Sequence, residues 1–258
     1  MRKRLGRFVA AVAAIIVALG ILNRGMNRAV VRTASGVVSP RSTVPRPAEK
    51  TMPVSPGFQG CPPFGDGGDR QLNFLKNRVD SADWVPTPFA TVIDLGWPAS
   101  VVKRMRDTWS RRDSIGVARH EGSPVVVEGY FVAAKQEGPE ATNCHGADAS
   151  FRDWHLWLAE VPGKDRQRSI VVETTPSIRA QHAEWSLTGI RKLVRDSTRV
   201  RVSGWLMLDP EHPEQLGKTR GTLWEIHPVM RIEVLRDSTW INFSPKPLSR
   251  TKTDTSTD

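Results

Sequence analysis

The same spacing of potential ligand residues occurs twice in this chain. Asp153 and His155 are two positions apart in the segment FRDWHLWLAE, and Glu225 and His227 are two positions apart in TLWEIHPVMRIEVL. Another carboxylate, Glu173, stands in the intervening segment SIVVET. Imidazoles and carboxylates that converge can hold a divalent metal ion or form an acid–base pair. These five residues are the candidate ligand or metal face of the protein.

Hydrophobic alternation predicts that the five residues share one side of a β-sheet. Apolar residues such as Leu156 and Leu158 fall on every second position of each segment, as in a strand with one buried face. Side chains alternate between the two faces of a strand, so the charged residues in between point away from the core. The alternative is an ordinary polar face that residues 59–120 cover, in which His227 is structural and Pro228 marks a bulge.

Five segments have this period of two, and one has a helical period. The predicted strands are Val125–Ala133, Phe151–Glu160, Ser169–Thr174, Val200–Asp209 and Thr222–Leu235. A helix is predicted over Ser186–Val194, between the third strand and the fourth. The order strand, strand, strand, helix, strand, strand is that of the OB-fold, a five-stranded Greek-key barrel. We therefore expect a mainly β (α+β) fold with an OB-like barrel; another small mixed barrel or an α+β sandwich is the alternative.

The resemblance to an OB-fold covers residues 123–236 and predicts where a ligand binds. Two of the strands carry the pattern V-x-V-x-G, which ends at Gly129 and Gly204, and glycine suits the bends of a small barrel. OB domains bind ligands over strands two and three and in the loops after strands one and four. The candidate loop contacts are therefore His145, Asp209 and His212.

Composition divides the chain into segments. All nine tryptophans lie between Trp84 and Trp240, so the core is expected within that span. Short helices are predicted over Gln71–Arg78 and Pro98–Trp109, and Ser100 is the expected cap of the second. The predicted organisation is a leader (1–29), a Pro/Ser/Thr-rich disordered stalk (30–58), a helical segment that packs on the barrel (59–122), the OB-like barrel (123–245) and a disordered tail (246–258).

The N-terminus has the character of an export signal. A basic start precedes an unbroken apolar run from Phe8 to Leu22, which is shorter than the roughly 20 residues that span a bilayer comfortably. The run fits a signal peptide cleaved near Ala18–Gly20, and equally a short transmembrane helix that Arg24 and Arg28 anchor. We therefore expect the protein in the cell envelope, either membrane-anchored or free in the periplasmic or extracytoplasmic space.

The formal net charge of +10 does not indicate a nucleic-acid partner. Residues 1–50 contain ten Lys or Arg and one acidic residue, so most of the net charge falls in the leader and the stalk. The rest of the chain is close to neutral and lacks the basic footprint of a nucleic-acid-binding domain. The expected partner is the membrane, through the N-terminal segment, and a protein or small-molecule ligand is left open.

The chain has two cysteines, Cys61 and Cys144. An exported chain meets an oxidising compartment, so the two are predicted to form a disulfide that pins the segment 59–120 to the barrel. The alternatives are two buried thiols, or a metal site made by Cys144 with the adjacent His145.

The sequence contains no signature motif of a common enzyme class, such as G-x-G-x-x-G, a Walker loop, H-E-x-x-H or G-x-S-x-G. Through its N-C-H, D-W-H and W-E-I-H-P-V segments the chain resembles small exported bacterial proteins without an assigned activity. We expect an exported OB-like module with a binding or structural role. The alternative is a metal-dependent, nuclease-like hydrolase that uses the His/carboxylate cluster, because nucleases of the staphylococcal type share a related barrel.

We expect residues 1–58 to direct export. Fused to a reporter that is active only outside the cytoplasm, this segment should give a signal, because a cationic start followed by an apolar run is typical of export sequences. The same reporter without the segment is the control. Recovery of the protein in the soluble cytoplasmic fraction would contradict the prediction.

Overall fold

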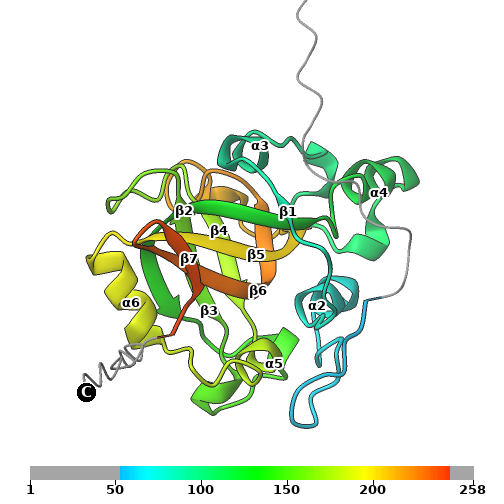
Figure 1. Cartoon of the computed structure of the whole chain (residues 1–258). Coiled ribbons are helices and arrows are strands. Elements are labelled where there is room, and N and C mark those ends of the chain that lie inside the picture. Colours follow the sequence, from blue (N-terminus) through cyan, green and yellow to red (C-terminus); the bar gives the residue numbers. More distant parts are fainter. Residues whose placement is uncertain (1–52, 245–258) are drawn as a thin grey trace, which may run out of the picture. The chain divides into compact units, whose positions relative to one another are not determined.

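The computed structural model describes residues 53–244 of the chain (Figure 1). The predicted leader (1–29), the predicted stalk up to residue 52 and the predicted tail (246–258) lie outside the described residues. Between residues 53 and 244, no helix has the length and apolar character that a membrane span requires.

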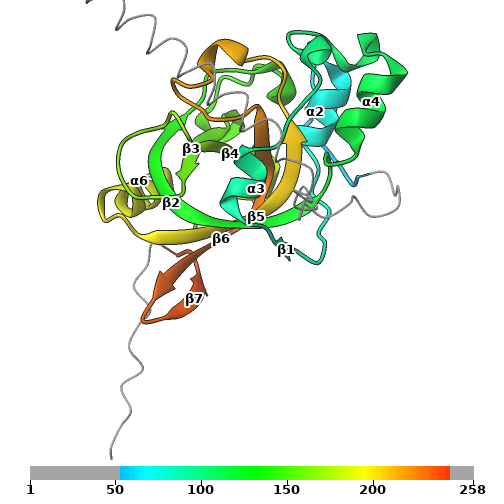
Figure 2. The same cartoon turned by 90° about the horizontal axis from the view of Figure 1, so that it is seen from above.

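Within this range five strands close into a barrel (Figure 2). They are β2 (Pro124–Gln136), β3 (Trp154–Ala159), β4 (Ile170–Thr174), β5 (Arg199–Leu208) and β6 (Trp224–Arg236). The strands pair in the order β2-β3-β4-β6-β5, and β5 pairs with β2 to complete the ring. The pairs are antiparallel except for β4 with β6, which is parallel. The predicted mainly β fold with an OB-like barrel is confirmed.

Alternating side chains give the barrel one apolar core. In β3, Leu156 and Leu158 are fully buried in this core, and they pair with Val172 and Ile170 of β4. Burying an aliphatic side chain of this size contributes about 1.5–3 kcal/mol. A slip of one residue would send the whole apolar set to the other face, so the core fixes which residues of these strands face outward.

Glycines stand where neighbouring strands come closest. A Cβ on Gly129 would lie 2.4 Å from the carbonyl oxygen of Ala159, and a Cβ on Gly204 would lie 2.5 Å from that of Pro228. Any other residue would push the strands apart at these points. The two glycines therefore occupy tight positions of the barrel, in keeping with the bends expected there.

Helix α6 (Leu187–Arg195) covers one end of the barrel, between β4 and β5 in sequence. The side chain of Ser186 caps the helix by accepting a hydrogen bond of 3.0 Å from the backbone of Gly189. Ile190 and Leu193 lie on its buried face and join the barrel core. The short helix α5 (Pro176–Arg179) precedes it.

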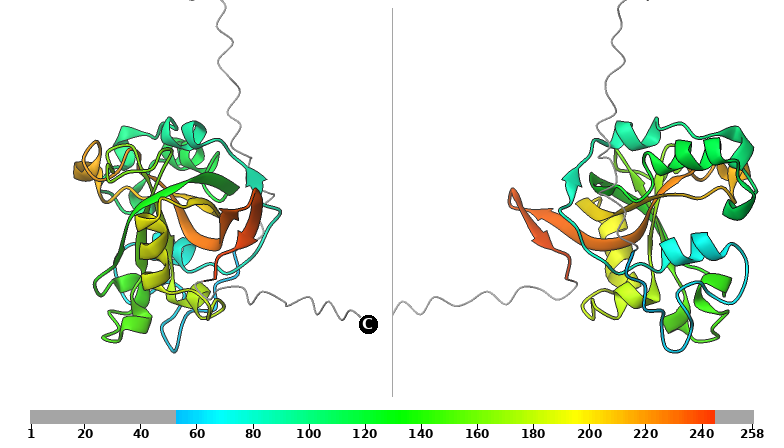
Figure 3. Two further views of the ribbon diagram at one scale, coloured as in Figure 1. Left: turned by 60° about the vertical axis from the view of Figure 1, so that its left-hand side comes forward. Right: turned by 90° about the vertical axis from the view of Figure 1, so that its right-hand side faces the viewer.

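Strand β6 shifts register against β5 on both sides of Gly204. Ile226 pairs with Leu206 and Val229 pairs with Gly204, so the stretch that contains Pro228 accommodates an extra residue. The bulge predicted at Pro228 is confirmed. Beyond it, β6 continues into a hairpin with β7 (Thr239–Asn242) that projects from the barrel (Figure 3).

The N-terminal part of the described chain wraps the barrel. Its elements are α2 (Arg70–Lys76), β1 (Val85–Pro86), α3 (Phe89–Ile93) and α4 (Arg111–Ala118). Strand β1 pairs in parallel with β2. Helix α3 lies at an end of the barrel, where its Phe89 and Val92 join the core (Figure 2).

The helix predicted over Pro98–Trp109 is wrong. The chain forms two 3-10 turns there, Ala99–Val101 and Arg106–Thr108, and a helix begins only at Arg111. Lys103 between the turns has a left-handed backbone (φ 55°), which a helix does not accept. A helix would place Val101, Met105 and Trp109 on one buried face, but Met105 is 51% exposed.

A disulfide joins Cys61 to Cys144, as predicted. It links the segment before α2 to the loop between β2 and β3. Asn77, at the end of α2, strengthens the same junction by donating hydrogen bonds to the carbonyl oxygens of Pro63 (3.1 Å) and Thr142 (2.9 Å). The bond is typical of proteins that fold in an oxidising, extracytoplasmic compartment.

We expect the double variant Cys61→Ser/Cys144→Ser to lose stability. The bond spans 83 residues, and chain entropy gives a loop of that length about 4 kcal/mol. Urea unfolding of the oxidised protein and the variant measures the difference. Reduced wild-type protein is the control and should match the variant. Two free thiols per denatured, unreduced chain would contradict the disulfide itself.

Candidate functional site

A cavity of about 720 Å³ lies against the outer side of the barrel wall. Its floor is the face of β3, β4 and β6 that points away from the core. Its walls are α2, the loop from residue 137 to 145 and the loop from residue 209 to 220. These two loops follow the first and the fourth barrel strands, which is where OB domains bind ligands.

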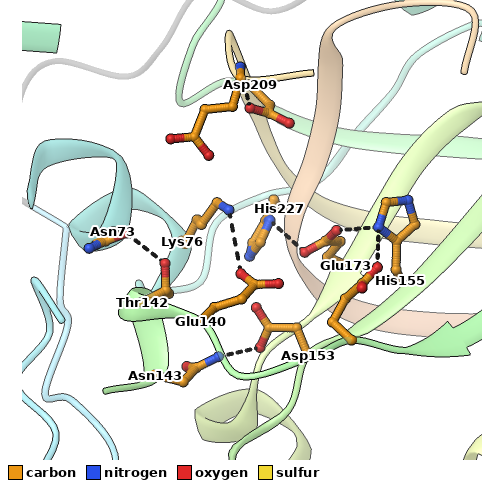
Figure 4. A network of polar contacts seen from close by, with 12 residues as sticks. Asn73, Lys76, Glu140, Thr142, Asn143, Asp153, His155, Glu173, Asp209 and His227 are labelled. Carbon is orange, nitrogen blue, oxygen red and sulfur yellow. Dashed lines mark hydrogen bonds and ion pairs between the residues drawn. The ribbon is translucent and has the colours of Figure 1, made fainter. Parts of the chain in front are cut away.

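Helix α2 forms one wall because its cap and its buried face are both fixed. Asp69 caps the helix by accepting two backbone hydrogen bonds of 3.0 Å, and its other oxygen accepts from the backbone of Arg106 at 2.6 Å. Asn73 accepts a hydrogen bond of 2.6 Å from the hydroxyl of Thr142. Lys76 is one turn further along the same buried face, so its ammonium points into the cavity (Figure 4).

Glu173 stands at the centre of the floor and contacts both candidate histidines (Figure 4). The Nδ1 atom of His155 is 2.7 Å from Oε1 of Glu173 and 2.9 Å from a carboxylate oxygen of Glu137. The Nδ1 atom of His227 is 3.4 Å from the other oxygen of Glu173 and 3.6 Å from Glu225. Histidines from two strands therefore meet at one carboxylate.

Asp153 completes the group of five predicted residues. It precedes β3, and its Oδ1 accepts a hydrogen bond of 2.9 Å from the side chain of Asn143. One oxygen of Asp153, one of Glu173 and a ring nitrogen of His227 lie within 4.8 Å of one another. The structure thus brings the five residues together, but at most 7% of any of them is exposed. They lie on the outer side of the barrel wall beneath the cover that α2 and the loops provide.

Arg220 neutralises two buried carboxylates, Asp209 and Glu225, the second of which belongs to the five predicted residues. Its guanidinium is 3.1 Å from Asp209 and 2.6 Å from Glu225, and all three side chains are almost completely buried. Asp209 also accepts a hydrogen bond of 2.9 Å from the backbone of Glu211. The pairing holds the loop after β5 against the first residues of β6.

Burial and charge shift the pKa values of the cavity residues in opposite directions. Burial raises the pKa of Glu140 to about 7, although Lys76 at 3.9 Å opposes this shift. Burial lowers the pKa of His155, but Glu173 and Glu137 outweigh it and raise that pKa to about 9. For Glu225 burial raises the pKa, and the charge of Arg220 more than compensates, so that it falls to about 2.

The cavity also has an aromatic wall. Trp157 of β3 is 4% exposed and lies under two cations, with Arg166 at 4.6 Å and Lys135 at 5.9 Å from its ring. Its indole nitrogen has no hydrogen-bond partner in residues 53–244. A flat ring beside several carboxylates suits a ligand with both a hydrophobic face and hydrogen-bond donors.

The three candidate loop contacts, His145, Asp209 and His212, all line the cavity. The two histidines are partly exposed at its rim, beside Asp66 and Glu214 respectively. Sequence reasoning missed Lys76, Glu137 and Arg220. Lys76 had a usable signal, because it shares a helix face with Leu72 and Asn73. Arg220 lies in a loop, where no periodicity identifies it.

The chain matches no protein-family model, and no curated protein has a significantly similar sequence. The site is therefore interpreted from its own geometry.

Removing Arg220 should destabilise the fold strongly. Arg220→Met leaves Asp209 and Glu225 buried without their cation, which costs about 3–5 kcal/mol. The matched control is Arg199→Met, which removes an ion pair to Glu128 whose side chains are 50% and 41% exposed and should cost no more than about 1 kcal/mol. Urea unfolding of both variants measures the difference. Equal losses would show that the buried pairs contribute no more than exposed ones.

Proposed function

We propose that this chain is an exported or membrane-tethered binding module of the cell envelope and that the cavity on its OB-like barrel is the ligand site. The observation that carries the proposal is the position of the cavity. It lies on the barrel face and between the two loops that OB domains use for binding. A volume of about 720 Å³ suits a small molecule.

The walls indicate the chemical class of the ligand. Carboxylates outnumber cationic side chains around the cavity, and ionised carboxylates only accept hydrogen bonds. Several of them, including Glu225 and Asp209, are already matched by Arg220, whereas Glu140 meets Lys76 only at 3.9 Å. The ligand that fits is small and rich in donors, with hydroxyl or ammonium groups. An extended anion such as a nucleic-acid backbone would meet repulsion.

Two features support the location at the envelope. The disulfide between Cys61 and Cys144 needs an oxidising compartment to persist. The basic start and apolar run of residues 1–22 have the pattern of an export signal or a short anchor. Together they favour a domain that meets its ligand outside the cytoplasm.

A second candidate function is metal-dependent hydrolysis. It is favoured by the contact of His155 and His227 with one carboxylate, Glu173. The acidic walls oppose a polyphosphate substrate, which weakens the comparison with nucleases. Binding of a donor-rich ligand is therefore the function that the geometry supports best.

We expect N-acetylglucosamine or putrescine, as hydroxyl-rich and ammonium-rich probes, to shift NMR signals of cavity residues, and inorganic phosphate to shift none. Trp157→Phe should weaken N-acetylglucosamine binding about fivefold, because it removes an indole donor, worth about 1 kcal/mol, to the acceptor oxygens of the sugar and keeps an aromatic ring. The matched control is Trp240→Phe on the projecting hairpin, which should leave binding unchanged. Shifts that cluster away from the cavity, or a preference for phosphate, would contradict the proposal.

A further inference from the structure

We propose that Asp153, Glu173 and His227 form a binding site for one first-row divalent transition-metal ion, such as Zn²⁺ or Mn²⁺, directly beneath the floor of the cavity, which Glu173 lines. The inference rests on the proposed function to the extent that the ion would form part of the same ligand site. It does not depend on which donor-rich ligand the cavity takes.

The first observation is the convergence of three side chains from three elements. Asp153 precedes β3, Glu173 lies in β4 and His227 lies in β6, and the register of these strands sets them side by side (Figure 4). One ligand atom of each lies within 4.8 Å of the other two. Zn²⁺ takes nitrogen and oxygen ligands at about 2 Å, which leaves ligand atoms roughly 3–4 Å apart. Small side-chain rotations suffice to reach that geometry.

The second observation is independent of the first. His227 is fully buried, and its Nε2 atom has no polar partner in the described part of the chain, while its Nδ1 atom makes only the two longer carboxylate contacts of 3.4 and 3.6 Å. Oδ2 of Asp153 is equally buried and unpartnered, while Oδ1 is held by Asn143. Buried polar groups are nearly always satisfied, so unpartnered atoms that face one point call for a ligand there. A metal cation is the ligand to which both an imidazole nitrogen and a carboxylate oxygen can bind.

The neighbouring residues act as the outer layer of such a site. The Nδ1 atom of His155 lies 2.7 Å from Oε1 of Glu173, which leaves the other oxygen of Glu173 directed to His227. Hydrogen bonds of this kind orient metal ligands and tune their affinity. A second group, formed by Glu137, His155 and Glu173, is the weaker candidate. There the same imidazole nitrogen is within hydrogen-bond distance of both carboxylates.

The mixed donor set selects the class of metal. One imidazole with two carboxylates is a ligand set of zinc and manganese sites, and three protein ligands leave a position for water or substrate. Ca²⁺ prefers six to eight oxygens and Mg²⁺ keeps most of its water, so both should bind weakly here. Lys76 is the competing cation, because its ammonium points into the same cavity from α2, where it lies 3.9 Å from Glu140.

The test is a titration of the full chain, purified in mild detergent and freed of metal with a chelator. We expect one Zn²⁺ or Mn²⁺ per chain by calorimetry and elemental analysis, and no comparable binding of Mg²⁺ or Ca²⁺. The isosteric variant Asp153→Asn, which can keep the hydrogen bond from Asn143, should weaken the affinity more than about tenfold. The matched control Asp148→Asn replaces an exposed cap in the same loop and should bind as the wild type does.

A measurement on the wild-type protein tests the proposal even if the Asp153→Asn variant fails to fold. Bound Mn²⁺ should broaden the NMR signals of Asn143 and His155 and leave those of Trp240 sharp. No metal bound at micromolar concentration, equal affinity in both variants, or broadening elsewhere would overturn the proposal, and Lys76 would then be the cation of the floor. The titration contains metal alone, so such a result would leave the binding of N-acetylglucosamine or putrescine untouched.

Discussion

Charge compensation beneath the cover of the barrel is the constraint on which the rest of the structure depends. Glu173, Glu225 and Asp209 are carboxylates withdrawn from water, and an unpaired buried charge is strongly unfavourable. Arg220 compensates two of them, and His155 hydrogen-bonds the third. The cations come from different elements, so the loops and strands have to be placed correctly before the charges match.

The barrel and its cover contribute different physical properties to the site. The barrel positions Glu173 and Glu225 on ladders of backbone hydrogen bonds, and His227 follows in the bulged stretch of β6. The cover buries Glu173 and Glu225, and burial strengthens the electrostatic interactions of these carboxylates. The disulfide at Cys61 holds the start of the cover against the loop from residue 137 to 145. A cavity with fixed charges is suited to selecting a ligand by its hydrogen-bond donors.

The part of the structure that could be predicted is the part in which apolar residues recur at the period of a strand or a helix. The five strands and the helix over Ser186–Val194 were predictable because one buried face imposes alternation on a strand and a stripe on a helix. The same alternation predicted that His155 and Glu173 share the outer side of the wall. Of the cover, the helix predicted over Gln71–Arg78 is present as α2. The rest was not predictable, since a 3-10 turn such as Arg106–Thr108 is held by polar contacts of long sequence separation. Arg220 was not identified from the sequence either, because it lies in a loop without hydrophobic periodicity.

The register shifts divide β6 into two parts whose side chains have different surroundings. Before the shifts, Glu225 lines the cavity; after them, Glu233 pairs with Arg201, whose guanidinium packs against the ring of Trp240 in the hairpin. Both halves of β6 pair with β5, Glu225 opposite Met207 and Glu233 opposite Arg201, but side chains past Pro228 do not line the cavity. Substitutions in the β6–β7 hairpin, or a protein fused to it, therefore leave the residues that line the cavity unchanged.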